Sequence, residues 1–283
     1  MNIPEGIFKS YDIRGIYPDQ INEENLAPIV RAIYKFFLQK YPGKDRLTIV
    51  LGRDMRLSSP SLFKIASETL VKLGAKVIDP GIVSTPTFYF TVFHYGYDAG
   101  FQISASHNPK DYNGLKIVVN SEKGLLKIGK STGMDDIKRM SLEGVELPEM
   151  EGGEITVKEG ILEDEFKNAE EIAGHPEIKA FKVVADPANA MGATFIEEVF
   201  KHIPGELVRM NFELDGSFPA HQPDPIQPET LVDLQAKVKY EKADLGLAPD
   251  GDGDRLFFID ENGEVVPPSI ITALAARELL KDK

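Results

Sequence analysis

The sequence predicts an α/β fold arranged in two consecutive domains. Short apolar runs alternate with amphipathic stretches, which is the pattern of α/β units. The 283 residues suffice for about two domains of roughly 100 to 200 residues each, and 42% hydrophobic residues can supply their cores. A stretch of turn-forming and acidic residues at 148–154 (PEMEGGE) interrupts the alternation. We therefore expect a domain boundary near residues 150–160.

The first half of the chain predicts alternating strands and helices. Ser59 begins a helix that runs through Leu73, with Pro60 at a favoured first-turn position and Gly74 at its end. The other predicted elements are a strand over Leu47–Leu51, a strand from Val77, a helix over Thr85–Tyr95, and strands over Ala99–Ile103 and Leu115–Val119. The aromatic side chains of the second helix are expected in the core, where aromatics usually pack; they are Phe88, Tyr89, Phe90 and Phe93.

The same alternation resumes after the boundary. The predicted elements are a strand over Lys182–Ala185, helices over Asn189–Phe200 and Glu229–Tyr240, strands over Asp244–Ala248 and Leu256–Asp260, and a helix over Ser269–Leu280. Asp186–Asn189 is interpreted as a helix-capping turn without a chemical role. Ligands of open α/β sheets bind beyond the carboxyl ends of strands. We therefore expect function in the loops that follow Ile103 and Ala248.

The loop Asp250–Arg255 (DGDGDR) has the composition of a site for a hard cation. Its three carboxylates stand on alternate residues with glycines between them, so they can close around one ion. Mg²⁺ takes oxygen ligands and usually keeps some positions for water or phosphate. Arg255 adds a planar fork that suits phosphate. The loop therefore indicates a metal held for phosphate chemistry.

Two other interpretations fit parts of this loop. A plain turn that feeds the following strand stays open, since Gly takes positive φ and Asp bonds its own backbone. An EF-hand calcium loop would place Glu261 at its twelfth position. That interpretation is rejected because its sixth position requires Gly and holds Arg255, and because the flanks predict strands.

A second polar cluster, residues 104–109 (SASHNP), lies between two predicted strands. A serine in such a loop can be a turn residue or a nucleophile, and His107 can activate Ser106 or merely orient it. On the strand that follows, Lys116 should point away from the face that Leu115 and Ile117 share. From the residues alone, Lys116 is either a surface lysine or a group that binds phosphate or transfers protons.

Composition excludes several classes of function. The formal net charge of −13 argues against nucleic acid or an anionic membrane as a partner. The chain has no cysteine, which excludes disulfides, thiolate catalysis and cysteine zinc sites and fits a cytoplasmic enzyme. We expect no signal peptide and no membrane-spanning segment.

Together these motifs resemble the α-D-phosphohexomutases. The similarity rests on SASHNP at 104–109 with NGLKI at 113–117, on PDGDGDR at 249–255 and on FKSYDIRG at 8–15. The last motif resembles the phosphomannomutase/phosphoglucomutase branch. Shorter similarities lie at Gly52–Asp54, Val83–Pro86 and Pro223–Pro225, so the resemblance covers nearly the whole chain in the order of the family.

The resemblance implies an isomerase of carbohydrate metabolism that moves a phosphoryl group between positions 6 and 1 of a hexose. It implies that Ser106 becomes a phosphoserine and that Asp250, Asp252 and Asp254, with a phosphoserine oxygen, hold one Mg²⁺ ion. By the same similarity Arg255 and Lys116 flank the transferring group, Arg14 contacts a phosphate and His107 supports the serine. A hexose 1,6-bisphosphate would be the activator and intermediate. Because the net charge is negative, local cations, Arg53 among them, must attract the anionic sugar phosphate.

The family has four domains, so the resemblance also implies that the chain is truncated. It implies two three-layer α/β/α domains with mixed sheets, over residues 1–153 and 154–262, and the start of an incomplete third domain at 263–283. A missing segment or a separate polypeptide would supply the other two domains, which recognise the sugar and its phosphate. The isolated chain is therefore expected to turn over hexose phosphates poorly.

Alternatives to the mutase were a non-catalytic metal-binding phosphoprotein module and a metal-dependent sugar phosphatase. The phosphatase is weakened because its acidic residues would have to supply a nucleophile, whereas Ser106 already provides one. The preferred hexose is left open. Lys9–Asp12 (KSYD) is less similar to the glucosamine branch, whose corresponding motif usually reads GTDG.

Overall fold

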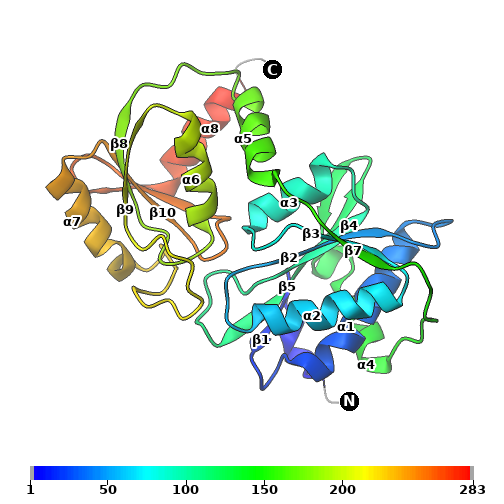
Figure 1. Cartoon of the computed structure of the whole chain (residues 1–283). Coiled ribbons are helices and arrows are strands. Elements are labelled where there is room, and N and C mark those ends of the chain that lie inside the picture. Colours follow the sequence, from blue (N-terminus) through cyan, green and yellow to red (C-terminus); the bar gives the residue numbers. More distant parts are fainter. Residues whose placement is uncertain (1–2, 281–283) are drawn as a thin grey trace. The chain divides into compact units, whose positions relative to one another are not determined.

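The structure of the chain, a computed structural model, describes residues 3–280 and divides into two compact units (Figure 1). The first unit comprises the chain up to Ala105 together with Pro109–Glu159. The second comprises Ser106–Asn108 together with the chain from Gly160 onward. Three residues of the loop after the strand at 99–103 thus belong to the second unit. Each unit is a mixed sheet with helices on both faces, which confirms the predicted α/β/α fold class.

The first unit contains seven strands and four α-helices within the described residues. They are β1 (Ile13–Ile16), α1 (Glu23–Lys40), β2 (Thr48–Arg53), α2 (Ser59–Lys72), β3 (Lys76–Asp79), α3 (Thr85–His94), β4 (Ala99–Ile103), β5 (Tyr112–Ser121), β6 (Gly124–Lys127), α4 (Met134–Glu143) and β7 (Glu154–Val157). The strand order is β1-β5-β4-β2-β3-β7, and β6 pairs with β5. Strands β4, β2, β3 and β7 run parallel, whereas β5 is antiparallel to both of its sheet neighbours β1 and β4.

Two apolar layers cover the sheet of the first unit. Helices α1, α2 and α4 pack on one face around buried side chains such as Phe37, Leu70 and Ile137. Helix α3 covers the other face, where Phe88 and Val92 contact Val50. Because successive side chains of a strand alternate between faces, this division decides which side chains of β5 lie in which layer.

A fully buried arginine braces the chain just after the serine loop. The Arg56 Nε lies 3.2 Å from Asp54 Oδ2, and its Nη1 donates to the carbonyls of Pro109 at 2.7 Å and Tyr112 at 2.9 Å. Asp54 Oδ1 accepts the Ser59 hydroxyl at 2.6 Å. A buried charge is tolerated only with such partners. The first unit therefore fixes the main chain on the exit side of the loop through this ion pair.

The second unit contains five strands and four α-helices within the described residues. They are α5 (Ile161–Ile172), β8 (Phe181–Ala185), α6 (Gly192–His202), β9 (Gly205–Arg209), α7 (Val232–Glu241), β10 (Leu245–Pro249), β11 (Leu256–Ile259), β12 (Val265–Val266) and α8 (Pro268–Leu279). The strand order is β12-β11-β10-β8-β9, with β10, β8 and β9 parallel. Helix α7 packs on one face, where Leu234 and Val238 meet Val184 and Ile259. Because β8 and β10 run parallel, their carboxyl ends lie at the same edge of the sheet.

Most predicted elements are present, and three details were wrong. The helix predicted from Glu229 begins as a 3-10 turn over Pro228–Leu231, and α7 itself starts at Val232. Helix α6 begins at Gly192 instead of Asn189, because Ala188 and Asn189 have positive φ (52° and 60°), which no right-handed helix accommodates. Phe93 is 57% exposed, whereas Phe88 is fully buried as expected. Residues 281–283, part of the predicted incomplete third domain, lie outside the described residues. Within residues 3–280 no helix combines the length and apolar character that crossing a membrane requires.

Replacing Arg56 by Met should destabilise the first unit by about 3–5 kcal/mol, because the change leaves the buried Asp54 carboxylate without its cation. Urea unfolding of the first unit measures the loss. As a control, Arg139→Met removes the exposed ion pair with Glu143 and should change stability by less than about 0.5 kcal/mol. Equal effects of the two substitutions would contradict the brace.

Candidate phosphoserine and metal site

The aspartate loop joins β10 to β11 in the second unit. Asp250 follows Pro249, the last residue of β10, and its N–H donates to the Arg255 carbonyl at 3.0 Å. Gly253 has φ +76° and donates its N–H to the Asp250 carbonyl at 3.0 Å. Glycine adopts this left-handed conformation without a Cβ penalty. The alternation of Asp and Gly therefore makes a tight turn that brings three carboxylates together.

The three carboxylates of this loop form a site that fits a hard divalent cation. Asp250, Asp252 and Asp254 each offer an oxygen, and these oxygens lie within 4.8 Å of one another. Asp250 and Asp252 are fully buried. Ligand oxygens of an octahedral Mg²⁺ at about 2.1 Å stand about 3–4 Å apart, so little closure is needed. Carboxylate oxygens are ligands that Mg²⁺ prefers, so the three aspartates suit this ion.

The raised pKa of the Asp250 carboxyl also favours a cation at this loop. Burial raises the pKa of the Asp250 carboxyl to about 6, the charges of Asp252 and Asp254 add to the rise, and Arg255 opposes it. Like charges gathered in a poorly solvated loop disfavour their own ionised forms. A bound cation would relieve this repulsion.

The serine loop meets the aspartate loop within the second unit. Ser106 is 4% exposed, and its hydroxyl donates to Asp250 Oδ2 at 3.1 Å. The backbone of Ser106 has φ +53°, a left-handed conformation that costs a non-glycine residue of order 1–3 kcal/mol. Such strain is concentrated at functional positions. The loop thus holds the serine hydroxyl against an aspartate at the expense of local backbone energy.

His107 and Arg255 lie beside the serine. Arg255 Nε donates to Asp250 Oδ2 at 2.9 Å, and its Nη2 donates to His107 Nδ1. Since a guanidinium can only donate, Nδ1 must accept and the neutral imidazole carries its proton on Nε2. Ser106 Oγ also lies 3.2 Å from this Nδ1. The arginine therefore bridges the histidine and the aspartate that contact the serine.

Gly251 permits the close approach of the two loops. A Cβ at this position would lie 2.4 Å from the Ser106 carbonyl oxygen and 3.1 Å from Pro223 Cγ. Its N–H donates to the Pro223 carbonyl at 3.0 Å. Only a residue without a side chain fits between these two segments, so the first glycine of the aspartate loop is required by packing.

Residues His221–Asp224, which we call the 221–224 segment, lie beside both loops. The Gln222 amide Nε2 donates to the His107 carbonyl at 3.0 Å. The Asp224 carboxylate lies 3.8 Å from Arg255 Nη1. The sequence predicted no role for His221 or Gln222, although the neighbouring Pro223–Pro225 contributed to the family resemblance. Asp186, interpreted only as a turn residue, does accept the Ala188 N–H at 3.0 Å but also contacts His221 at 3.2 Å.

The surroundings of His221 favour its protonated form. Its Nε2 faces the Asp186 carboxylate at 3.2 Å and its Nδ1 faces the Gln222 carbonyl at 3.0 Å. Both partners are acceptors, so the imidazolium, with a proton on each ring nitrogen, can donate to both. The hydrogen bond to Asp186 raises the pKa of His221 above its ordinary value of 6.5, the carbonyl of Gln222 and the charge of Asp233 add to the rise, and burial opposes it.

Two predicted site residues, Arg14 and Lys116, belong to the first unit. Arg14 forms an ion pair with Asp12. Lys116 lies on β5 between Leu115 and Ile117, which both pack in the core beneath α1, so the lysine faces the other side of the sheet as predicted. Arg53, expected among the local cations, pairs with Asp79 at 2.9 Å and lies over the Phe63 ring. The catalytic roles of Arg14 and Lys116 stay predictions.

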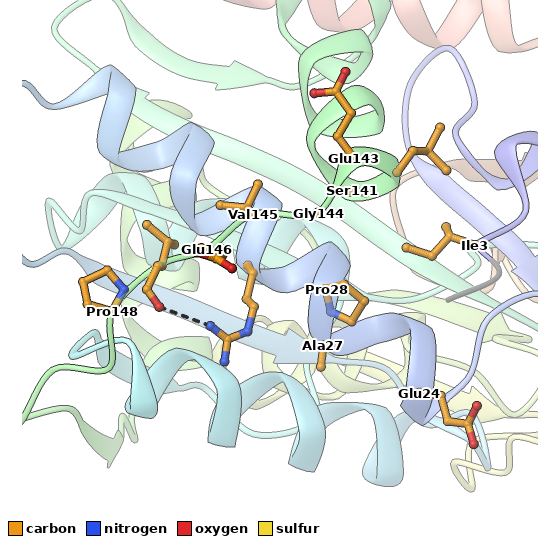
Figure 2. Close-up of a pocket in the computed structure, with 13 residues that line it drawn as sticks. Ile3, Glu24, Ala27, Pro28, Ser141, Glu143, Gly144, Val145, Glu146 and Pro148 are labelled. Atoms are coloured by element: carbon orange, nitrogen blue, oxygen red, sulfur yellow. Dashed lines mark hydrogen bonds between the residues drawn. The ribbon is translucent and has the colours of Figure 1, made fainter.

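A cavity of about 1150 Å³ lies elsewhere in the first unit (Figure 2). Figure 2 shows Ala27 and Pro28 of α1 on one side and Val145 and Pro148 on the other. No predicted site residue lines it. This cavity therefore contains none of the groups expected to bind metal or phosphate.

Comparisons with known proteins identify the family of the chain. Residues 5–138 match the family model of phosphoglucomutase/phosphomannomutase α/β/α domain I, and residues 164–263 match that of domain II. A phosphomannomutase of Vibrio cholerae is 35% identical over 279 residues, which are 97% of this chain and 59% of that protein. A phosphomannomutase/phosphoglucomutase of Pseudomonas aeruginosa is 36% identical, over 98% of this chain and 57% of that protein.

Solved structures extend the similarity to the fold. A phosphoglucomutase/phosphomannomutase family protein of Burkholderia thailandensis superposes with a TM-score of 0.86 and 31% identity, over 99% of this chain and 60% of that one. The fold defines a two-unit α/β protein whose second unit brings the serine and aspartate loops together. The chain belongs to the phosphoglucomutase/phosphomannomutase family, the α-D-phosphohexomutases. It spans about three fifths of the length of these relatives.

The charge on His221 predicts a pH dependence of stability. Because its folded pKa is raised above 6.5, its contribution is fully present below about pH 6.5 and is lost as the pH rises through the folded value. Urea unfolding from about pH 5.5 to about pH 9 should show a larger loss of stability in the wild-type protein than in His221→Gln, because the titration of Asp250 near pH 6 is common to both. The exposed His175 gives the control, since His175→Gln should leave the profile unchanged. Identical profiles for wild type and His221→Gln would refute the assignment.

Proposed function

We propose that this chain carries the phosphoserine and metal-binding part of a phosphohexomutase, which interconverts hexose 6-phosphate and hexose 1-phosphate. The observation that supports the proposal most directly is the 3.1 Å contact between Ser106 Oγ and Asp250 Oδ2, in a loop with three carboxylate oxygens within 4.8 Å. Phosphoryl transfer depends mainly on positioning and on electrostatic stabilisation by a metal and cationic side chains. The second unit groups three carboxylates that could hold such a metal with the guanidinium of Arg255.

The proposed step transfers phosphate from phosphoserine 106 to a sugar hydroxyl. The hydroxyl oxygen forms a bond to phosphorus while the Oγ–P bond breaks, and its electron pair stays on Oγ. The hydroxyl proton passes to a neutral Lys116 amine, which returns a proton when the second phosphate of the hexose 1,6-bisphosphate moves back to Ser106. Arg255 would pair with equatorial phosphate oxygens through its planar fork. Mg²⁺ at Asp250, Asp252 and Asp254, joined by a phosphoserine oxygen, would neutralise charge on the phosphate.

The remaining assignments follow from family membership. We infer that Arg14 contacts a phosphate and that His107 supports Ser106. We also infer that residues 1–153 and 154–262 are the first two domains and that residues 263–283 begin a third. Other polypeptide, continuous or separate, would then complete the hexose site, and the isolated chain would turn over hexose phosphates poorly. A cytoplasmic location fits the absence of cysteine from the sequence.

Incubation of the chain with Mg²⁺ and a hexose 1,6-bisphosphate carrying ³²P tests the proposal. We expect stable label on Ser106, no label in Ser106→Ala, and labelling slowed at least about a hundredfold in Asp252→Asn, which removes one cation ligand. Mass spectrometry of the labelled peptide identifies the residue. Glu261→Gln, an exposed carboxylate near the loop, is the control and should label normally. Release of inorganic phosphate without stable label would favour a phosphatase, and neither product would favour a non-catalytic module.

Lys116→Met should separate metal binding from proton transfer. The substitution removes the amine proposed to accept the hydroxyl proton and leaves the Asp250 loop unchanged, so transfer of phosphate from Ser106 to a hexose monophosphate should fall by about a hundredfold to ten-thousandfold. Serine phosphate prepared on the variant should therefore persist when the sugar is added, as measured by retained label. Loss of label at the wild-type rate would remove Lys116 from the mechanism.

A further inference from the structure

The 221–224 segment contacts the candidate site through successive residues. His221 is anchored to Asp186, which directly follows β8. Gln222 reaches the serine loop, and the Pro223 carbonyl accepts the Gly251 N–H of the aspartate loop at 3.0 Å. Asp224 then faces Arg255. One short segment thus touches the serine loop, the aspartate loop and the arginine between them.

We propose that Gln222 is a positioning residue, which holds the main chain of the serine loop against the aspartate loop through its hydrogen bond to the His107 carbonyl. The inference rests on the proposed function, because it concerns the geometry of the same phosphoserine. The bond is 3.0 Å long and joins residues 115 positions apart in the chain. Since Ser106 keeps a left-handed backbone, the loop needs contacts that oppose its relaxation.

The anchoring of Gln222 explains how a flexible side chain can act in this way. The His221 ring donates from Nδ1 to the Gln222 carbonyl and from Nε2 to Asp186, and the Asp224 N–H donates to the same Gln222 carbonyl at 2.8 Å. Asp186 is itself fixed by the Asn211 amide at 2.9 Å. The Gln222 carbonyl oxygen therefore accepts two hydrogen bonds, which fix the main chain from which the Gln222 side chain extends. Groups held in this way place a reacting atom within the narrow tolerance that catalysis needs.

Gln222→Glu is the informative substitution, because it keeps the shape and removes the donor. Loss of one hydrogen bond of about 1 kcal/mol should speed amide hydrogen exchange in Ser106–Asn108 by about fivefold. The initial rate of Ser106 labelling by hexose 1,6-bisphosphate should fall at least as much, with the KM for the bisphosphate unchanged. Gln222→Lys retains a donor and should restore part of the labelling rate.

Gln235 provides a matched control. Its Nε2 donates to the Gly263 carbonyl at 2.7 Å, so it makes the same type of bond at another place in the second unit. Gln235→Glu should lower the melting temperature of the protein about as much as Gln222→Glu does. It should change neither amide hydrogen exchange at Ser106–Asn108 nor the rate of Ser106 labelling. A merely structural role for Gln222 predicts equal behaviour of the two variants.

The outcomes separate this inference from the proposed function. Unchanged exchange at Ser106–Asn108 in folded Gln222→Glu, or an equal change in Gln235→Glu, overturns the positioning role. Absence of label on the wild-type chain overturns the proposed function, and the exchange comparison then decides alone whether Gln222 orders the loop. Faster exchange, slower labelling at constant KM and rescue by Gln222→Lys together support the inference.

Discussion

Repulsion among three carboxylates on one short loop is the constraint that organises the second unit. Asp250 and Asp252 are fully buried, and a buried anion is costly unless opposite charge or hydrogen-bond donors accompany it. The Asp250 carboxylate accepts three hydrogen bonds. They come from the guanidinium of Arg255, from the backbone N–H of Arg255 and from the Ser106 hydroxyl. The protein thus compensates part of the negative charge of the three carboxylates, and a divalent cation would compensate more of it. Repulsion among the aspartates thus explains why hydrogen-bond donors surround this buried loop.

The serine loop is stabilised by two unrelated interactions. In the first unit, the buried Arg56 binds the carbonyls of Pro109 and Tyr112, which follow the loop. In the second unit, Gln222 binds the carbonyl of His107, within the loop. Both side chains donate to main-chain oxygens, so these bonds act on the backbone and not on the Ser106 hydroxyl. An unfavourable backbone angle at Ser106 can persist because the residues around it are fixed.

The serine loop, the aspartate loop and most strands were predictable because their signals are local. Carboxylates on alternate residues, a polar run between apolar strands and a proline in a first turn are visible in a few consecutive residues. The roles of Arg56 and Gln222 were not predictable, since any residue presents the same carbonyl oxygen and the acceptors lie 53 and 115 positions away. The start of α6 was misplaced for a related reason: left-handed angles at Ala188 and Asn189 depend on contacts such as the bond from Asn189 to Glu213.

Ser106–Asn108 pack with the second unit although they lie within the stretch of sequence that forms the first, so the structural unit and the continuous sequence segment have different boundaries. These three residues are encoded in the middle of the first unit, whereas their packing partners follow Gly160. A gene fragment beginning at residue 160 would retain every aspartate of the cation loop and Arg255 yet lack the hydroxyl that completes the cluster. Duplication of the second unit as one contiguous segment would therefore give a carboxylate loop without the serine hydroxyl that contacts Asp250.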